Sequence, residues 1–198
     1  MVESQVRDRG IVDERILDSM LRVARHKFVP MEVRDCSYQD RPLPILCDQT
    51  ISQPFIIGNC LELLELSAGQ RVLEVGSGCG YVAALLSLLV SEVWGIEYYG
   101  PLVDLASKTL IDQGATNVRI LQGDGKLGAV DFAPYDRILV SCAARKVESS
   151  WLDQLRPGGI LVCPLQDGHD QYLYKLGKGL TGWKYESKHT RVRFVPLL

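Results

Sequence analysis

Apolar stretches of two lengths alternate along the middle of the chain. Short apolar runs predict strands at Arg71–Val75, Glu92–Ile96, Val118–Gln122, Arg137–Ser141 and Ile160–Pro164. Longer stretches between them predict helices at Tyr81–Leu89, Pro101–Gln113 and Val147–Leu155. Strands that alternate with helices build a parallel sheet through right-handed crossovers, with helices on both faces. The pattern therefore predicts an α/β fold with a doubly wound, mostly parallel sheet.

The two ends of the chain have different patterns. Asp13 is a good N-cap for a helix whose apolar residues begin at Ile16, and further helices are expected at Pro30–Tyr38 and from Pro54 to about Leu66. The tail predicts antiparallel strands that close one edge of the sheet, at Gln171–Leu176, Trp183–Ser187 and Arg191–Pro196. We expect one domain over residues 1–198, comprising N-terminal helices and a substrate loop (1–66), a cofactor-binding core (67–165) and C-terminal antiparallel strands (166–198).

Composition and charge narrow the class of protein. The chain has 198 residues, 46% of them hydrophobic, and a net charge of −2, which argues against a nucleic-acid binder that works by neutralising phosphates. No apolar run approaches the roughly 20 residues that span a bilayer, and the N-terminus has no signal-peptide pattern. The six cysteines include no C-x-x-C pair, and the three histidines are far apart. We expect a cytoplasmic monomer with reduced thiols and no bound metal, membrane or nucleic acid.

A glycine-rich turn follows the first central strand, in the run Leu73-Glu74-Val75-Gly76-Ser77-Gly78-Cys79-Gly80. Glycines at a strand-to-helix turn let a ligand approach bare backbone. Dinucleotide sites favour G-x-G-x-x-G, but here the third glycine comes one residue early. Glu74 would repel a diphosphate and suit a cationic ligand that carries an amino group, such as S-adenosylmethionine. The alternative is a tight turn without a ligand.

Acidic residues also follow the next two strands. Glu97 stands where a carboxylate can accept hydrogen bonds from the ribose hydroxyls of a nucleotide-like ligand. Asp124 lies between Gly123 and Gly125, where it can reach an adenine amine. The alternative for Glu97 is an acidic residue near the start of the following helix, where the helix dipole favours a negative charge. The alternative for Asp124 is a surface turn.

These features resemble class I S-adenosylmethionine-dependent methyltransferases, and further segments are similar to the protein-L-isoaspartate (D-aspartate) O-methyltransferase family. The similarity extends from about Ile16 to the last residue. The segments that carry it are Arg25–Pro30, Asp40–Ile45, Gln49–Pro54, Ala133–Asp136, Leu155–Gly159 and Val192–Leu197.

The resemblance implies a Rossmann-like methyltransferase fold and methyl esterification of isoaspartyl carboxylates in damaged proteins, with S-adenosyl-L-homocysteine as the product of the cofactor. It implies Ser52 as the catalytic residue, and substrate contacts from Thr50, Ile51, Val192, Phe194 and Val195. Cofactor contacts are implied for Gln49, Thr50, Glu74, Gly76, Ser77, Gly78, Glu97, Tyr98, Asp124 and Gly125. A carboxylate is already ionised at neutral pH, so the reaction needs alignment and exclusion of water, and no general base. Ser52 could orient one carboxylate oxygen or could cap the helix that begins near Pro54.

The sequence departs from the family pattern in two loops. Leu46-Cys47-Asp48 replaces glycine-containing positions and adds a negative charge near the expected substrate site. Arg145-Lys146 replaces a proline-containing run, and these cations could attract the substrate carboxylate or be solvated. The alternatives to isoaspartyl repair are a methyltransferase with another peptide or small-molecule acceptor and a non-catalytic cofactor-binding module. An NAD-dependent oxidoreductase fits the glycine loop less well.

Overall fold

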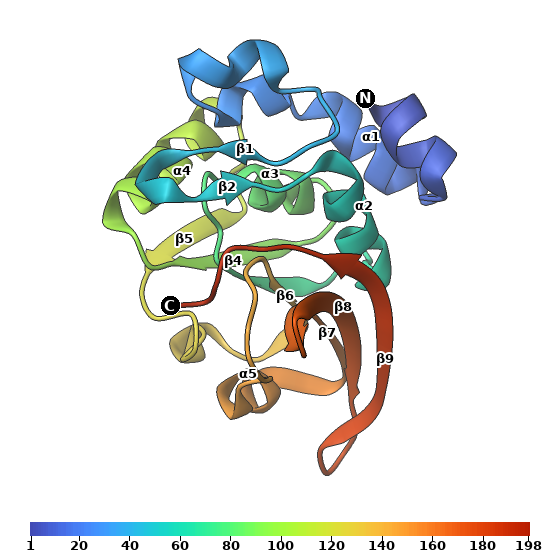
Figure 1. Cartoon of the computed structure of the whole chain (residues 1–198). Coiled ribbons are helices and arrows are strands. Elements are labelled where there is room, and N and C mark those ends of the chain that lie inside the picture. Colours follow the sequence, from blue (N-terminus) through green and yellow to red (C-terminus); the bar gives the residue numbers. More distant parts are fainter.

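The central element is a seven-stranded sheet with the strand order β5-β4-β3-β6-β7-β8-β9 (Figure 1). The computed structural model describes residues 1–198, apart from the side chains of Lys184 and Tyr185. The five strands from β5 to β7 in that order are parallel, whereas β8 and β9 pair antiparallel with their neighbours. This confirms the predicted fold class. The strands are β3 (Arg71–Val75), β4 (Glu92–Glu97), β5 (Val118–Gln122), β6 (Tyr135–Val140), β7 (Leu155–Asp167), β8 (Asp170–Lys178) and β9 (Trp183–Val192).

The C-terminal edge differs in detail from the prediction. Two strands were expected after residue 182, but β9 is continuous, because Lys188 and Arg191 both stay paired with β8 across an irregularity in the register. After Val192 the chain leaves the sheet and runs back across it, where Pro196 bridges to Ala143 (Figure 1). The prediction of a separate strand at Arg191–Pro196 is therefore wrong, since most of that segment crosses the edge of the sheet.

The helices are close to their predicted places. They are α1 (Glu14–Arg22), α2 (Pro54–Leu63), α3 (Tyr81–Ser87), α4 (Gly100–Asp112) and α5 (Ser149–Gln154). Asp13 caps α1, and its Oδ1 accepts a hydrogen bond of 2.9 Å from the Arg15 backbone N–H. The helix expected at Pro30–Tyr38 is a 3₁₀ helix, Met31–Cys36. Shorter helical turns occur at Val2–Val6, Arg7–Arg9, Arg25–Phe28, Leu46–Asp48 and Val130–Phe132, and a small hairpin pairs β1 (Leu43–Pro44) with β2 (Thr50–Ile51).

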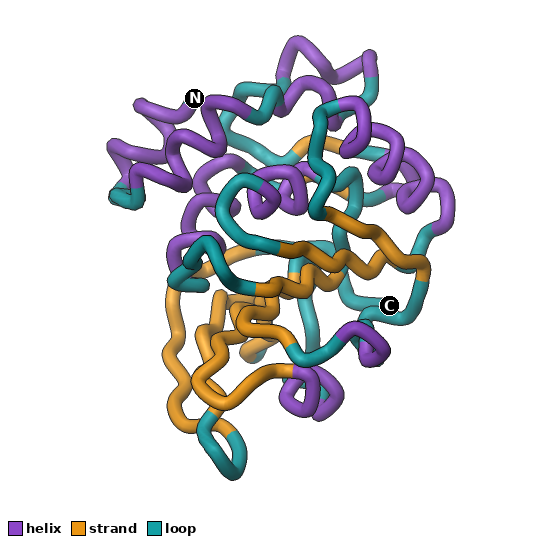
Figure 2. Tube along the Cα trace, turned by 180° about the vertical axis from the view of Figure 1, so that it is seen from behind, coloured by secondary structure: helices purple, strands orange, loops and turns teal.

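Alternating side chains of the central strands pack on opposite faces of the sheet. Val72 of β3 belongs to the core beneath α1–α4, whereas the next residue, Leu73, belongs to the core that includes Trp151 of α5. Successive residues of a strand point to opposite faces, so a strand made of consecutive apolar residues is buried on both sides. Figures 1 and 2 show the resulting layers, with most helices on one side of the sheet and α5 on the other.

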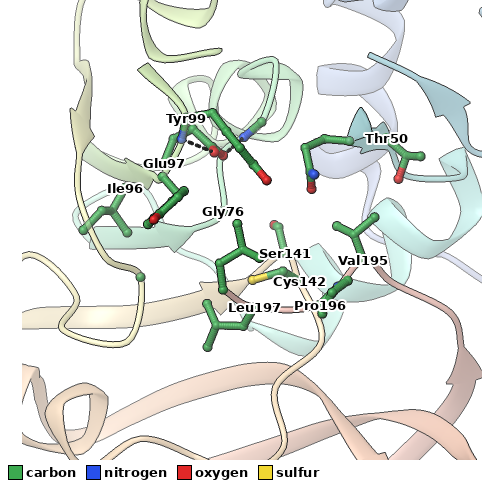
Figure 3. A pocket seen from close by; sticks show the side chains of 15 residues that line it. Thr50, Gly76, Ile96, Glu97, Tyr99, Ser141, Cys142, Val195, Pro196 and Leu197 are labelled. Carbon is green, nitrogen blue, oxygen red and sulfur yellow. Dashed lines mark hydrogen bonds between the residues drawn. The ribbon is translucent and has the colours of Figure 1, made fainter. Parts of the chain in front are cut away.

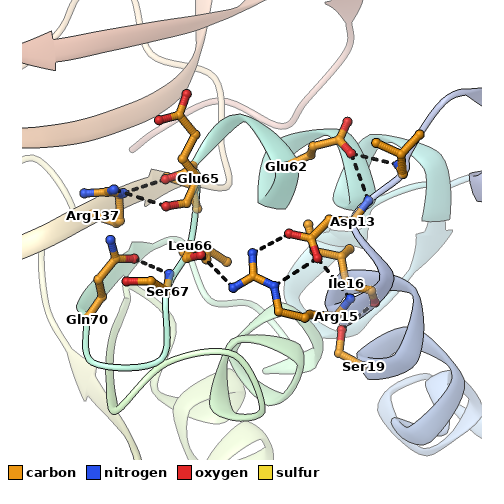
Figure 4. Close-up of polar contacts among 12 residues, drawn as sticks. Asp13, Arg15, Ile16, Ser19, Glu62, Glu65, Leu66, Ser67, Gln70 and Arg137 are labelled. Atoms are coloured by element: carbon orange, nitrogen blue, oxygen red, sulfur yellow. Dashed lines mark hydrogen bonds and ion pairs between the residues drawn. The ribbon is translucent and has the colours of Figure 1, made fainter.

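The loop after α2 is fastened to the sheet and to α1 (Figure 4). Glu65 has a φ of 50°, which ends the helix before the predicted boundary near Leu66. The Arg137 guanidinium donates to the carbonyls of Leu64 and Glu65, and Arg15 donates to the Leu66 carbonyl at 2.9 Å. These contacts join the N-terminal helices to the sheet.

No helix in the described part of the chain combines the length and the apolar character that crossing a membrane requires.

Candidate active site

A first cavity, here called the cofactor cavity, opens where β3, β4, β5 and β6 end (Figure 3). Gly76, Gly78 and Gly80 of the glycine loop have φ values of 80°, 54° and 83°, a region that non-glycine residues rarely adopt. A Cβ on Gly76 would lie 3.2 Å from the Cys142 Sγ, so glycine also preserves space there. The cavity is lined by Gln49, Thr50, Gly76, Gly78, Ile96, Glu97, Tyr98, Tyr99, Gly125, Ser141, Cys142 and Val195–Leu198.

Glu97 lies at the side of this cavity and is 6% exposed. Its Oε2 accepts a hydrogen bond of 2.8 Å from the Gly78 backbone N–H, and its Oε1 accepts one of 3.0 Å from Tyr99 N–H. The carboxylate thereby ties the glycine loop to the start of α4. An ionised carboxylate has about four acceptor positions, so Glu97 can hold these two bonds and still accept from ribose hydroxyls. The two interpretations of Glu97 in the sequence are thus compatible.

Glu74 lies beneath the surface of the cofactor cavity. It is 1% exposed and does not line the cavity. Its Oε1 accepts a hydrogen bond of 2.9 Å from the Ser141 hydroxyl, whereas its buried Oε2 has no hydrogen-bond partner among the described residues. Burial raises the pKa of the Glu74 carboxyl to about 7. Ser141, which does line the cavity, separates Glu74 from it.

The turn after β5 supplies one residue that lines the cavity and one that lies beside it. Gly125 lines the cavity, and a Cβ there would lie 2.7 Å from Val75 Cγ1, so only glycine fits without displacement. The Gly125 carbonyl accepts a hydrogen bond of 2.8 Å from the Trp151 indole. Asp124 is half-buried beside the cavity, and its Oδ1 accepts a hydrogen bond of 2.8 Å from Lys126 N–H. Like Glu74 and Ser77, Asp124 does not itself line the cavity.

A second cavity, the substrate cavity, adjoins the first. It is lined by Pro42, Thr50, Ser52, Gln53, Ile56, Ser141 and Arg191–Val195. The lining includes Ser52, the predicted catalytic residue. Of the predicted substrate contacts it includes Thr50, Val192, Phe194 and Val195, but not Ile51, which is buried. The N-cap of α2 is Gln53, and no side chain bonds to the cap, so the Ser52 hydroxyl is not used as the cap.

The cavities meet at three residues, Thr50, Ser141 and Val195, which line both. In Figure 3, Ser141 lies between Glu97 on one side and Thr50 on the other. The Val195 carbonyl accepts a hydrogen bond of 2.8 Å from Ala143 N–H, which fixes the C-terminal segment beside the loop after β6.

Sequence reasoning missed several lining residues. They are Ile96, Tyr99, Ser141, Cys142 and Pro196–Leu198 in the cofactor cavity, and Pro42, Gln53, Ile56, Arg191 and Arg193 in the substrate cavity. Ser141 had a usable signal, because it directly follows the central strand β6 and lies at the same edge as the glycine loop.

The two unusual loops differ in their distance from the site. Cys47 and Asp48, at the tip of the β1–β2 hairpin, have φ values of 58° and 55°, so the conformation that glycine adopts easily is kept without glycine. Asp48 is exposed and lines neither cavity. Arg145 and Lys146 are likewise exposed outside both linings, and Lys146 lies 3.6 Å from Glu148.

Comparisons with known proteins identify the family of the chain. A family model described as protein-L-isoaspartate(D-aspartate) O-methyltransferase (PCMT) matches residues 1–198. Protein-L-isoaspartate O-methyltransferases of Methanosarcina mazei and Dictyoglomus turgidum are each 42% identical to the chain; the matches cover 95% and 97% of it and 78% and 87% of those proteins.

Solved structures are similar over the whole chain. One protein-L-isoaspartate O-methyltransferase gives a TM-score of 0.88 at 28% identity, over 99% of this chain and 65% of its own, so the chain spans just under two thirds of that protein. A Plasmodium falciparum PCMT in complex with S-adenosyl-L-homocysteine gives 0.86 at 25% identity, over 100% and 96%. The chain belongs to the protein-L-isoaspartate(D-aspartate) O-methyltransferase family of S-adenosylmethionine-dependent methyltransferases, as its motifs predict.

Proposed function

We propose that this chain transfers a methyl group from S-adenosylmethionine to the free carboxylate of L-isoaspartyl, and D-aspartyl, residues in damaged proteins. The observation that carries the proposal is the junction of the two cavities at Thr50, Ser141 and Val195. A ligand in each cavity would meet its neighbour there.

The residues of the first cavity fit the cofactor. Gly76 and Gly125 leave room that any Cβ would fill, Glu97 has free acceptor positions for ribose hydroxyls, and Tyr98 lies at the same edge. When bound, the cofactor supplies an activated methyl group on a sulfonium, which is a good leaving group. We propose that Gln49, Thr50, Gly76, Gly78, Glu97, Tyr98 and Gly125 contact the cofactor directly, and that Glu74, Ser77 and Asp124 support the loops around it.

The residues of the second cavity fit an anionic peptide. Arg191 and Arg193 line it and no acidic residue does, although the chain as a whole has a net charge of −2. Arg191 pairs with Asp170, whereas Arg193 makes no ion pair with the residues whose side chains are described. A cavity lined by one sign of charge raises the local concentration of a ligand of the opposite sign.

The work left to the protein is alignment. A carboxylate of the aspartyl type ordinarily has a pKa of about 3.9, so no side chain has to remove a proton before the substrate attacks. We expect Ser52 and Thr50 to orient one carboxylate oxygen and Val192, Phe194 and Val195 to form the wall along which the peptide lies, since all five line the second cavity. Gln171 already holds the Phe194 backbone, with its Oε1 accepting from Phe194 N–H at 2.7 Å, so this wall is fixed before the peptide arrives.

The direct test uses two synthetic peptides that differ only in one L-isoaspartyl or L-aspartyl residue, with labelled S-adenosylmethionine. We expect base-labile methyl esters on the isoaspartyl peptide alone. We expect Ser52→Ala to lower kcat/KM roughly 10- to 100-fold, the loss of one oriented contact to a charged group, while the exposed Ser91→Ala stays at the wild-type rate. Cofactor binding without ester formation would instead favour another acceptor or a non-catalytic binding module.

We also propose that residues 1–198 act as a single methyltransferase domain and as a monomer in the cytoplasm. All six cysteines are free thiols, which suits a reducing compartment. Light scattering coupled to size exclusion tests the monomer, which has a mass of 22.1 kDa.

A further inference from the structure

Ser141 occupies an unassigned position at the centre of the site. It follows β6, lines the cofactor and substrate cavities, and also lines a small apolar cavity beneath them with Ile57 and Cys60. Its backbone N–H donates to the Val75 carbonyl at 2.8 Å, which fixes it beside the glycine loop. Ser141 therefore presents one polar side chain at the point where the methyl group has to pass.

The direction of its hydrogen bond limits what Ser141 can do. The hydroxyl donates its only proton to Glu74 Oε1 at 2.9 Å. A hydroxyl whose proton is committed in this way presents lone pairs to the cavity, so it can accept a hydrogen bond and is unsuited to donate one to a carboxylate. Its partner in the cavity must therefore be a hydrogen-bond donor.

The layout of the cavity indicates which donor group of the cofactor would lie nearest to Ser141. Glu97 lies where the ribose is expected, and Gly125 lies beside Asp124, where the adenine is expected, so the sulfur and the amino-acid portion of the cofactor lie toward Ser141 and Thr50. The α-ammonium of that portion is a cation with three donors. Directly behind Ser141, Glu74 is almost fully buried, and its Oε2 has no hydrogen-bond partner among the side chains that the structure describes. A buried carboxylate behind a hydroxyl makes that hydroxyl a better acceptor for a cation.

We propose that the Ser141 hydroxyl, oriented by Glu74, accepts a hydrogen bond from the α-ammonium of the cofactor. Ser141 is the contacting group and Glu74 is a positioning residue that acts through it. This inference rests on the proposed function, because it takes the first cavity as the site of S-adenosylmethionine.

The test compares two ligands by calorimetry at pH 8: S-adenosylhomocysteine and its deamino analogue, in which hydrogen replaces the α-ammonium. We expect Ser141→Ala to weaken S-adenosylhomocysteine about 10-fold or more, the usual effect of one hydrogen bond to a charged group, and to leave the deamino analogue within twofold. The matched control is Ser87→Ala, whose hydroxyl bonds to its own helix at Ala84 outside both cavities, and which should leave both affinities unchanged.

A double-mutant cycle tests the role of Glu74. We expect Glu74→Gln to weaken S-adenosylhomocysteine in the wild-type background and to have little further effect in the Ser141→Ala background. Equal weakening of both ligands by Ser141→Ala, no weakening at all, or full additivity of the two substitutions would overturn the inference. If the wild-type protein binds neither ligand, the assignment of the cavity fails instead.

Discussion

Glu74 is a charged residue type in a position where charge is costly. It is the fourth of the five residues of β3, is 1% exposed and accepts a hydrogen bond from Ser141. Burial raises its pKa from the ordinary value of 4.5 to about 7. Between these values the folded protein keeps a proton that the unfolded chain has released, so stability falls as the pH rises through this window.

This gives a first prediction, for Glu74→Gln in the absence of cofactor. At pH 8 we expect the variant to be more stable than the wild type by about 1–3 kcal/mol, because it removes a buried carboxylate, and the difference should shrink toward pH 5. Urea unfolding at both pH values measures this. A pH-independent difference would mean that Glu74 stays ionised or stays protonated across the range.

A second prediction at the residue scale concerns two glycines. Gly80 has a φ of 83°, and an added Cβ would lie 3.1 Å from Ala106 Cβ and 3.3 Å from Leu110 Cδ1. We expect Gly80→Ala to destabilise the protein by about 2 kcal/mol, from left-handed strain and crowding against α4. Gly69→Ala is the control, because its Cβ meets nothing within 4 Å and its φ is ordinary. Thermal unfolding that moved equally in both variants would contradict this.

At the scale of elements, a single buried arginine connects the N-terminal helical turns to the substrate loop. Arg25 is fully buried, and its guanidinium donates to the carbonyls of Ser37 and Ser52, each at 2.8 Å. It also lies 5.2 Å from the ring centroid of Tyr81, at the start of α3. Burial lowers its pKa, and it forms no ion pair with the residues whose side chains are described. The position of Ser52 thus depends on a distant helical turn.

A third prediction follows for Arg25→Met. We expect a loss of about 2–4 kcal/mol, because the buried Ser37 carbonyl and the part-buried Ser52 carbonyl lose their donor, together with a raised KM for the isoaspartyl peptide. Arg22→Met should stay within about 0.5 kcal/mol, since its ion pair with Asp18 is exposed. Urea unfolding and steady-state kinetics measure both effects. Equal stability of the two variants would show that Arg25 does not hold the loop.

Sequence reasoning found the elements that local pattern determines. Runs such as Val72–Val75 are buried on both faces, so their pattern is typical of central strands, and β3 and β5 have their predicted bounds. The continuity of β9 depends on pairing with β8 across an irregularity at Tyr172 and Tyr174, and no periodicity within the segment shows that. The short hairpin β1–β2 is likewise held by contacts distant in sequence.

The candidate site divides in the same way. Gly76 and Glu97 line the cofactor cavity as their motifs predict. The contact between Glu74 and Ser141 could not be predicted from the sequence. It depends on the register of β3 against β6, which places Glu74 beside Leu139. In the sequence, Asp48 replaces a glycine-containing position and adds a negative charge near the expected substrate site. In the structure its backbone adopts a φ of 55°, and its side chain lines neither cavity.

At the scale of the whole molecule, binding and stability are linked. The cofactor cavity draws on the glycine loop, the β1–β2 hairpin and the C-terminal segment, so a ligand there contacts only the folded chain. As a fourth prediction, we expect S-adenosylhomocysteine at 100 times its Kd to add about 2.7 kcal/mol of stability, or roughly 5–10 °C in Tm. NAD should give no shift, and Glu97→Ala should lose most of the response. A shift with NAD alone would contradict the assignment of the cavity.

The path of the last residues has a practical consequence. Val195 to Leu198 lie along the rim where ligands would enter, with Leu197 donating its N–H to the Ala143 carbonyl at 2.8 Å. An affinity tag or fluorescent protein fused after Leu198 would start beside the cofactor cavity and could block the binding of ligands. Tags for purification or immobilisation are better attached at the N-terminus, because Met1 precedes a helical turn that lies far from the cofactor cavity.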